Sequence, residues 1–373
     1  MASYSAEVAP ENRPKTAPEN CPKAHLDASA ADVPLFTTEQ QSTSNLSLPN
    51  AVSTAASSIS NPALEVDFIE SDSSGAESAT QSVRAPSSAP SLRSLIYNFV
   101  EEHGRTFHRY REGKYPLPND AQEQDRLDFQ HNFMLILLEG RLQLAPIREN
   151  LQNVLDVGTG TGIWAIEFAS RYPSASVIGT DLSPIQPWFV PPNCQFEIDD
   201  AEDEWLYSEE FDFIHMRGMI ACFSDPRSVI ERAYNHCAPG GYLEMQDGMF
   251  PLHCHDDSLE GTALDVWAKA CVEAGAKIGR PWNNAPNYKR WMEELGFEEV
   301  NEKIFEIPTS TWPRGKKAKE LGIWFHANMM DGLGASKVLL TKAMAWTPER
   351  VELLLMDVRK DLKNTGVHAY MPL

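Results

Sequence analysis

The sequence lacks most features that would place it in a membrane, in a secretory pathway or around a metal. Its 373 residues contain no apolar run near the ~20 residues that span a bilayer, and the N-terminus has no apolar core of a secretory signal. Six cysteines occur and none forms a C-x-x-C pair, so neither a zinc site nor a disulfide framework is expected. We therefore expect an intracellular protein with no metal.

Basic residues are scarce as well. The chain has 32 Lys and Arg against 53 Asp and Glu, which gives a formal net charge of −21. An acidic surface repels nucleic-acid phosphates and anionic lipid. We therefore expect neither nucleic acid nor a membrane as a direct partner. The hydrophobic fraction of 42% is sufficient for a proper folded core.

Composition and periodicity divide the chain into three regions. Residues 1–90 are rich in Ser, Ala, Pro, Thr and Asn, and we expect a disordered tail because they cannot bury enough apolar surface. Residues 91–150 are expected to form an N-terminal helical extension or lid. Residues 151–373 are expected to form the main domain, with a helical insertion at about 256–296.

The extension is predicted to contain two helices. Apolar residues recur at helical spacing over 92–100 and again over 119–144. Asn119 or Asp120 is the expected N-cap of the second helix. An aromatic and basic stretch, residues 107–116, lies between the two helices.

Short apolar runs alternate with amphipathic helices in the main domain. The predicted strands cover residues 154–157, 176–180, 195–198, 211–216 and 241–245. Helices are predicted at 163–171, 226–237, 259–274, 288–295, 316–330 and 348–363, with a further strand at 299–307. Strands that alternate with helices form a parallel, doubly wound sheet. The sequence therefore predicts an α/β Rossmann-like fold.

The loop after the first predicted strand contains Gly158, Gly160 and Gly162, with Asp156 just before it. Glycine lets the backbone pass close to a ligand and adopt φ > 0. The dinucleotide pattern G-x-G-x-x-G fails here, because its third glycine would fall on Ile163. A carboxylate at Asp156 would also repel a pyrophosphate, whereas it suits the ammonium of a methionine moiety. The loop therefore favours S-adenosylmethionine over a nicotinamide cofactor.

Acidic residues follow the next two predicted strands. Asp181 lies at the end of the second strand, about 20 residues past the glycines, where an acid can hold ribose hydroxyls. Asp199, Asp200 and Ala201 follow the third strand, where a carboxylate or backbone amide could hold the adenine edge. Open α/β sheets bind ligands at the carboxyl ends of their strands. These residues are therefore predicted to share one cofactor site with Asp156.

Methyl transfer relies mainly on positioning and desolvation of the nucleophile. A general base helps only where the acceptor must lose a proton. His215, near the end of the fourth predicted strand, is a candidate base because histidine accepts protons at physiological pH. His253 and His255 follow the fifth strand but lack the further ligands that a metal site needs.

The stretch between the predicted helices of the extension contains Arg109, Tyr110 and Tyr115. Aromatic rings in this position could form a lid that excludes water and shapes an acceptor pocket. The same stretch could instead be a structural segment that ties the extension to the sheet. Both interpretations stay open from the sequence.

Several stretches, of which the glycine loop is only one, match a known family. They cover residues 108–110, 115–120, 154–164, 179–186, 199–202, Trp205 and 214–217. On these residues the chain resembles class I methyltransferases, and more narrowly the LaeA-type fungal methyltransferases. The Tyr-Pro-Leu-Pro-Asn-Asp stretch at 115–120 and Asp-Leu-Ser-Pro-Ile-Gln at 181–186 are the most specific. The resemblance covers the chain from about Leu95 to its end.

The resemblance implies methyl transfer from S-adenosylmethionine to a small molecule in fungal secondary metabolism. It equally implies a second role, a nuclear regulator that works with velvet-type partner proteins, so both cytoplasm and nucleus are expected compartments. One departure stands out. Family members usually continue past Leu373 into a terminal strand, so we expect an exposed sheet edge and a weaker fold here.

Overall fold

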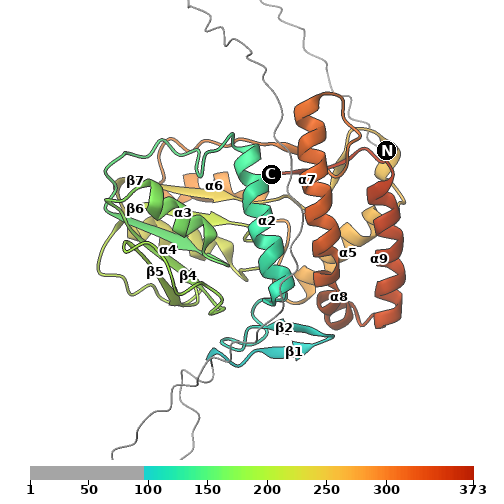
Figure 1. Cartoon of the computed structure of the whole chain (residues 1–373), viewed down its shortest axis with the longest axis horizontal. Coiled ribbons are helices and arrows are strands. Elements are labelled where there is room, and N and C mark those ends of the chain that lie inside the picture. Colours follow the sequence, from blue (N-terminus) through green and yellow to red (C-terminus); the bar gives the residue numbers. More distant parts are fainter. Residues whose placement is uncertain (1–95) are drawn as a thin grey trace, which may run out of the picture. The chain divides into compact units, whose positions relative to one another are not determined.

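Figure 1 shows the computed structural model, which describes residues 96–373. The tail expected at 1–90 lies outside these residues. Within the described part of the chain, a parallel sheet with its helices lies on one side of helix α2 (Ala121–Leu137) and a bundle of helices lies on the other (Figure 1). A search of the same residues finds no helix with the length and apolar character needed to cross a membrane.

Five strands form the central sheet, in the order β5-β4-β3-β6-β7, and every neighbouring pair is parallel. The strands are β3 (Asn153–Val157), β4 (Ser176–Asp181), β5 (Cys194–Ile198), β6 (Phe211–Arg217) and β7 (Cys237–Gln246). The order reverses between β3 and β6, and such a switch point is where open α/β sheets bind ligands. The predicted Rossmann-like fold is confirmed.

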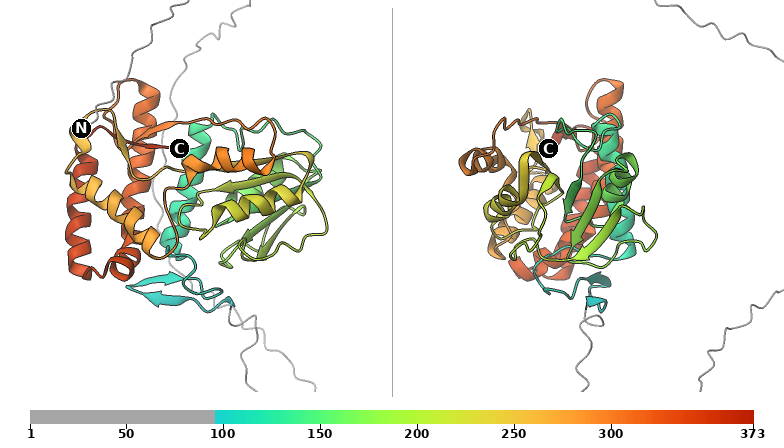
Figure 2. Two further views of the ribbon diagram at one scale, coloured as in Figure 1. Left: turned by 180° about the vertical axis from the view of Figure 1, so that it is seen from behind. Right: turned by 90° about the vertical axis from the view of Figure 1, so that its left-hand side faces the viewer.

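Consecutive residues of β3 pack on opposite faces of the sheet. Val154 belongs to a buried cluster with helix α3 (Ile163–Arg171), while Leu155 belongs to a cluster with helix α4 (Pro226–His236). Helix α6 (Tyr288–Leu295) packs beside α4, as the view from behind shows (Figure 2). Both faces are therefore covered, which explains why the strands read as continuous apolar runs.

The helical bundle has its own buried core, which extends onto α2. Its helices are α5 (Ala263–Lys277), α7 (Lys316–Gly332), α8 (Ser336–Met344) and α9 (Pro348–Lys363). Phe129 of α2 stacks on Trp324 of α7 with ring centroids 4.7 Å apart, so α2 joins the two parts. The hydroxyl oxygens of Thr262 and Thr347 accept backbone hydrogen bonds at the N-termini of α5 and α9. Short 3₁₀ turns lie at Asp257–Leu259, Ala285–Asn287 and Leu333–Ala335.

The last residues of the chain form a strand in a second, antiparallel sheet. In this sheet β10 (Ala369–Pro372) lies between β8 (His253–Cys254) and β9 (Glu306–Pro308). Among the described strands β7 pairs only with β6. The strand predicted at 299–307 is wrong except at its end, because pairing with β10 begins only at Glu306.

Of the helix predicted over 92–100 the structure describes residues 96–100, in which Ile96 is helical and the chain then leaves the helix, so the prediction is wrong beyond Ile96. Instead, β1 (Val100–Glu102) and β2 (Arg105–Phe107) form an antiparallel hairpin. His103 and Gly104 join the strands with φ of 51° and 74°, the two positive values that a tight hairpin turn of this kind requires. The second helix begins as predicted, with the carboxylate of Asp120 accepting from the backbone N–H of Glu123 at 3.1 Å.

Candidate active site

A cavity opens at the carboxyl edge of the central sheet, against α2 and the helical bundle. We call its two walls the sheet side and the helical side. The sheet side consists of polar residues and glycines: Asp156, Gly158, Gly160, Asp181, Asp199, Asp200, Ala201 and Arg217. The helical side consists mainly of apolar residues, with a few polar ones: Phe133, Phe250, Trp267, Phe325, Met329 and Leu333, together with Glu123, Arg126, Gln130 and Asn328. The cavity therefore joins a charged wall to an aromatic one.

The glycine loop bends sharply under the cavity. Gly158, Gly160 and Gly162 have φ of 68°, 59° and 81°, a region that other residues enter only with strain. A Cβ on Gly158 would lie 2.6 Å from Cε of Met219, and one on Gly162 would lie 2.3 Å from the ring of Phe196. Gly158 and Gly160 line the cavity, whereas Gly162 does not and packs against Phe196 beneath the loop. Only the first two glycines therefore face the space that a ligand could occupy.

Asp156 lies in β3 with 3% of its surface exposed and lines the cavity. One carboxylate oxygen accepts from the hydroxyl of Thr159 at 2.6 Å, and the other accepts from Nδ1 of His215 at 2.7 Å. Because a carboxylate only accepts, Nδ1 of His215 must carry a proton. Two donors thus fix the orientation of this buried carboxylate.

His215 lines the cavity but is almost fully buried. Its ring is 1% exposed and stacks on Trp164, with centroids 3.8 Å apart and planes 4° from parallel. Its Nε2 atom is buried and has no hydrogen-bond partner in the described residues. The burial of Nε2 argues against the general-base role expected from the sequence, and the contact of Nδ1 with Asp156 favours a positioning role.

Asp181 ends β4 and is held by the backbone around it. Its carboxylate oxygens accept from the N–H of Gly160 at 2.9 Å and of Ser183 at 2.8 Å. Burial raises the pKa of Asp181 to about 6, and the charge of Asp156 acts in the same direction. The glycine loop and the end of β4 are thereby joined at the cavity wall.

The residues after β5 have different environments. Asp199, Asp200 and Ala201 all line the cavity, and burial raises the pKa of Asp199. The buried carboxylate of Asp200 forms ion pairs with Lys114 and with Arg111. Asp200 is therefore occupied by side chains from the N-terminal extension, which the sequence did not predict.

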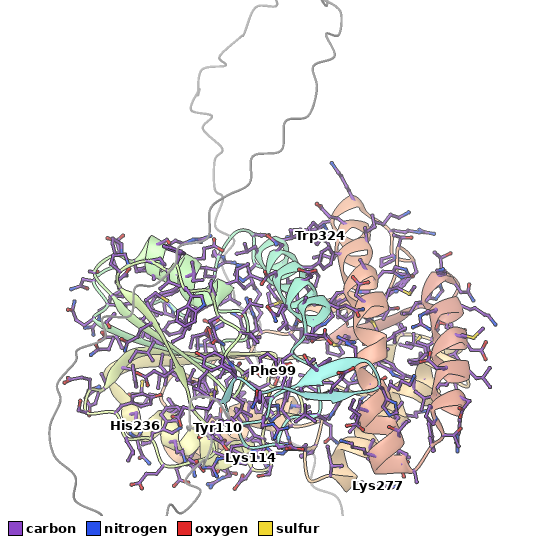
Figure 3. The ribbon with its side chains drawn as sticks, turned by 60° about the horizontal axis from the view of Figure 1, so that its bottom comes forward. Phe99, Tyr110, Lys114, His236, Lys277 and Trp324 are labelled. Atoms are coloured by element: carbon purple, nitrogen blue, oxygen red, sulfur yellow. The ribbon has the colours of Figure 1, made fainter. Side chains whose placement is uncertain are left out.

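The aromatic and basic stretch ties the extension to the sheet through Arg111 and Lys114. Arg111 and Lys114 make the ion pairs to the end of β5, and Figure 3 labels Lys114 near Tyr110 on this segment. Arg109 instead donates to the carbonyl oxygen of Asn98 at 3.1 Å. Neither Arg109 nor Tyr110 lines the cavity, which for these two residues favours the structural segment over the lid, whereas Tyr115 does line it.

A buried ion pair stands beside the apolar residues of the helical side. Arg126 of α2 binds both carboxylate oxygens of Glu123, at 3.0 and 2.6 Å. Its Nη1 atom donates to Gln130 at 2.9 Å and to Asn328 of α7 at 2.8 Å. These groups neutralise one another, so the helical side carries little net charge. Trp267 of α5 also belongs to this wall.

Histidines outside the cavity form separate pairs. His255 lies 3.0 Å from Glu306 on the second sheet, and both side chains are more than half exposed. Among residues 96–373 no group of three or more His, Cys, Asp or Glu side chains is arranged to hold a metal ion.

The switch-point cavity, the glycine loop and the carboxylates at successive strand ends define a class I, S-adenosylmethionine-dependent methyltransferase. A family model described as a methyltransferase domain matches residues 129–302. The chain is 38% identical to methyltransferase pytC of Aspergillus terreus, over 77% of this chain and 90% of pytC. It is 32% identical to the probable methyltransferase tdiE of Emericella nidulans, over 76% and 90%. It is 37% identical to the secondary metabolism regulator laeA of Monascus pilosus, over 72% and 75%. The chain belongs to the LaeA-type fungal methyltransferase family.

Proposed function

We propose that this methyltransferase acts on an apolar small molecule of fungal secondary metabolism. The observation that carries the proposal is the cavity itself, in which the charged sheet side continues into the aromatic helical side. Apolar walls with a few polar groups are typical of small-molecule sites. Among residues 96–373 the only carboxylate of the helical side belongs to Glu123, which is bonded to Arg126, so this wall favours an uncharged acceptor.

We assign the cofactor to the sheet side. Asp156 would hold the methionine ammonium, Asp181 the ribose hydroxyls, and Asp199 with Ala201 the adenine. The residues fit this ligand, because three carboxylates at adjacent strand ends line one wall and the loop at Gly158 has no Cβ in the way. We assign Asp200 to holding Lys114 of the extension.

The bound cofactor supplies a methyl group on a sulfonium, which is already a good leaving group. The chain's own residues then have to orient the acceptor and exclude water. Tyr115 and the apolar residues of the helical side would exclude water. Gln130 and Asn328, whose amides line the cavity, would offer hydrogen bonds that orient the acceptor. No step assigned here needs a general base.

Calorimetric titration of the full chain with S-adenosylmethionine and S-adenosylhomocysteine tests the cofactor site. We expect one-to-one binding that Asp156→Ala abolishes. Asp225→Ala is the matched control, because Asp225 caps α4 and does not line the cavity. Methyl transfer to a panel of apolar aromatic metabolites, followed by mass spectrometry, tests the acceptor. Transfer only to charged acceptors would contradict the proposal.

A second function is favoured by one observation, the similarity to relatives named secondary metabolism regulator laeA. We infer from it a regulator that binds a velvet-type protein partner in the nucleus. The two functions differ in a measurable way. Under regulation, a complex with a velvet-domain protein forms on size-exclusion chromatography and survives Asp156→Ala. Under the leading proposal the chain acts in the cytoplasm and needs no such complex for methyl transfer.

A further inference from the structure

Arg217 is the one cation on the sheet side of the cavity within the described residues. It is the last residue of β6 and lines the cavity beside Asp156 and Gly218. It forms no ion pair among residues 96–373, and its one hydrogen bond runs from Nη2 to Nδ1 of His131 at 3.0 Å. A half-buried guanidinium with most of its donors unused is a strong site for an anion, above all a carboxylate.

His131 and Glu167 hold this guanidinium from behind. His131 lies on α2, is 1% exposed, and its Nδ1 accepts from Arg217, so the ring proton must sit on Nε2. That Nε2 atom donates to the carboxylate of Glu167 on α3 at 2.8 Å. Burial and the charge of Arg217 both lower the pKa of His131, which keeps the ring neutral. Side chains from α2 and α3 thus hold the guanidinium of Arg217, which lies at the end of β6.

The order of the strands indicates which end of a bound cofactor, the adenosine or the methionine, lies near Arg217. Along the carboxyl edge of the sheet, Asp199 follows β5 and Asp181 ends β4, on one side of β3. Arg217 ends β6, on the other side of β3. A cofactor whose adenosine lies over β4 and β5 therefore extends its methionine end across the glycine loop toward β6.

The charges at this end match an α-amino acid. Asp156 and Arg217 both line the cavity and do not pair with each other, because Asp156 is bonded to Thr159 and His215. One carboxylate and one guanidinium complement the ammonium and carboxylate of a zwitterion. If Arg217 served only to neutralise Asp156, we would expect an ion pair between the two side chains.

We propose that Arg217 binds the α-carboxylate of the methionine moiety, and that His131, anchored by Glu167, positions it. This inference rests on the proposed cofactor site. It makes Arg217 a specificity residue that distinguishes S-adenosylmethionine from adenosyl compounds without the carboxylate. His131 acts only through Arg217 and does not touch the ligand.

Calorimetry with three ligands and the full chain tests the assignment. S-adenosylmethionine has both charged groups, its decarboxylated form keeps only the amine, and methylthioadenosine has neither. We expect the wild-type chain to prefer S-adenosylmethionine over the decarboxylated form by tenfold or more. Arg217→Gln should remove that preference and leave methylthioadenosine affinity within twofold, while Arg217→Lys should restore part of the preference.

Two further variants separate positioning from structure. His131→Leu should reduce the preference, whereas His131→Asn, which can offer an oxygen near the place of Nδ1, should retain most of it. Arg171→Gln is the matched control, because Arg171 also binds Glu167 but is exposed and outside the cavity wall. It should leave the preference unchanged.

The possible results distinguish a failure of the carboxylate assignment from a failure of the cofactor site. If Arg217→Gln binds methylthioadenosine normally and still prefers S-adenosylmethionine as strongly as wild type, the carboxylate assignment is overturned and the cofactor site stands. If the folded wild-type chain binds none of the three ligands, the cofactor site is overturned and the assignment of Arg217 with it.

Discussion

The sheet side of the cavity comes from one stretch of chain between Asp156 and Arg217, whereas the helical side is assembled from residues as far apart as Phe133 and Leu333. The two walls also differ in what fixes each residue. On the sheet side, positive φ angles and single carboxylates limit a position to one or a few residue types. On the helical side, a residue needs to be apolar and of fitting size. Positions on the sheet side of this chain should therefore tolerate fewer substitutions than positions on the helical side.

The strongest test of this difference concerns the ion pair beside the helical side. Arg126→Met leaves Glu123, whose side chain is 3% exposed, without its partner. Breaking a buried pair in this way costs about 3–5 kcal/mol, which urea denaturation would measure. Affinity for S-adenosylhomocysteine should change little in the variant that remains folded, because Arg126 lies outside the sheet side.

Lys317→Met is the matched control for this prediction. Lys317 pairs with Glu139, and their side chains are 61% and 65% exposed. An exposed pair of this kind contributes ~1 kcal/mol or less. Equal losses of stability in the two variants would mean that the pair on the helical side is not effectively buried.

The second prediction concerns the glycine loop. Gly158→Ala adds a Cβ 2.6 Å from Met219 at φ 68°, so the loop must shift where the cofactor passes. We expect S-adenosylhomocysteine to bind ~10- to 100-fold more weakly, since small displacements at a binding loop have large effects. Gly279→Ala has a similar φ of 70° with open space around its Cβ. It should lose similar stability but keep its affinity, and weak binding in both variants would contradict the prediction.

These contrasts explain what could be predicted from the sequence. The parallel sheet and the sheet-side acids were recoverable, because each strand and the loop after it form a local pattern. Trp267 was not recognised as part of the cavity wall, since an apolar residue at helical spacing looks the same whether it faces a core or a ligand. The partners of Asp200 were missed for another reason. Lys114 lies far from Asp200 in sequence, and nothing local indicates that pairing.

The third prediction separates positioning from catalysis at His215. His215→Leu removes a donor to the buried carboxylate of Asp156, so affinity for S-adenosylmethionine should fall ~tenfold. With an acceptor from the metabolite panel, kcat should stay within about threefold, whereas loss of a general base lowers it ~10²–10⁴-fold. His215→Asn, which places an amide N–H near the position of Nδ1, should recover much of the affinity. A large fall in kcat with unchanged affinity would restore the base assignment.

The smallest effect expected is a pH dependence, which arises at Asp181 on the sheet side. Burial raises the pKa of this carboxyl to about 6 from an ordinary value of 3.8. In the cofactor-free protein the folded state therefore holds the proton more tightly than the unfolded chain. The resulting stabilisation is complete below about pH 4 and is lost as the pH rises through about 6. Melting temperatures of the cofactor-free chain should follow this direction.

Cofactor binding should have the opposite pH dependence, because the ionised carboxylate accepts hydrogen bonds from ribose hydroxyls. Between pH 5 and pH 7 the ionised fraction of a group with a pKa of about 6 rises from about a tenth to about nine tenths, so affinity should rise about ninefold. Asp181→Asn should bind more weakly and lose this slope. Asp247→Asn is the control, because burial raises the pKa of Asp247 to about 7 but Asp247 does not line this cavity. A slope that survives in Asp181→Asn and disappears in Asp247→Asn would move the titrating group away from the ribose and weaken its assignment to the sheet side.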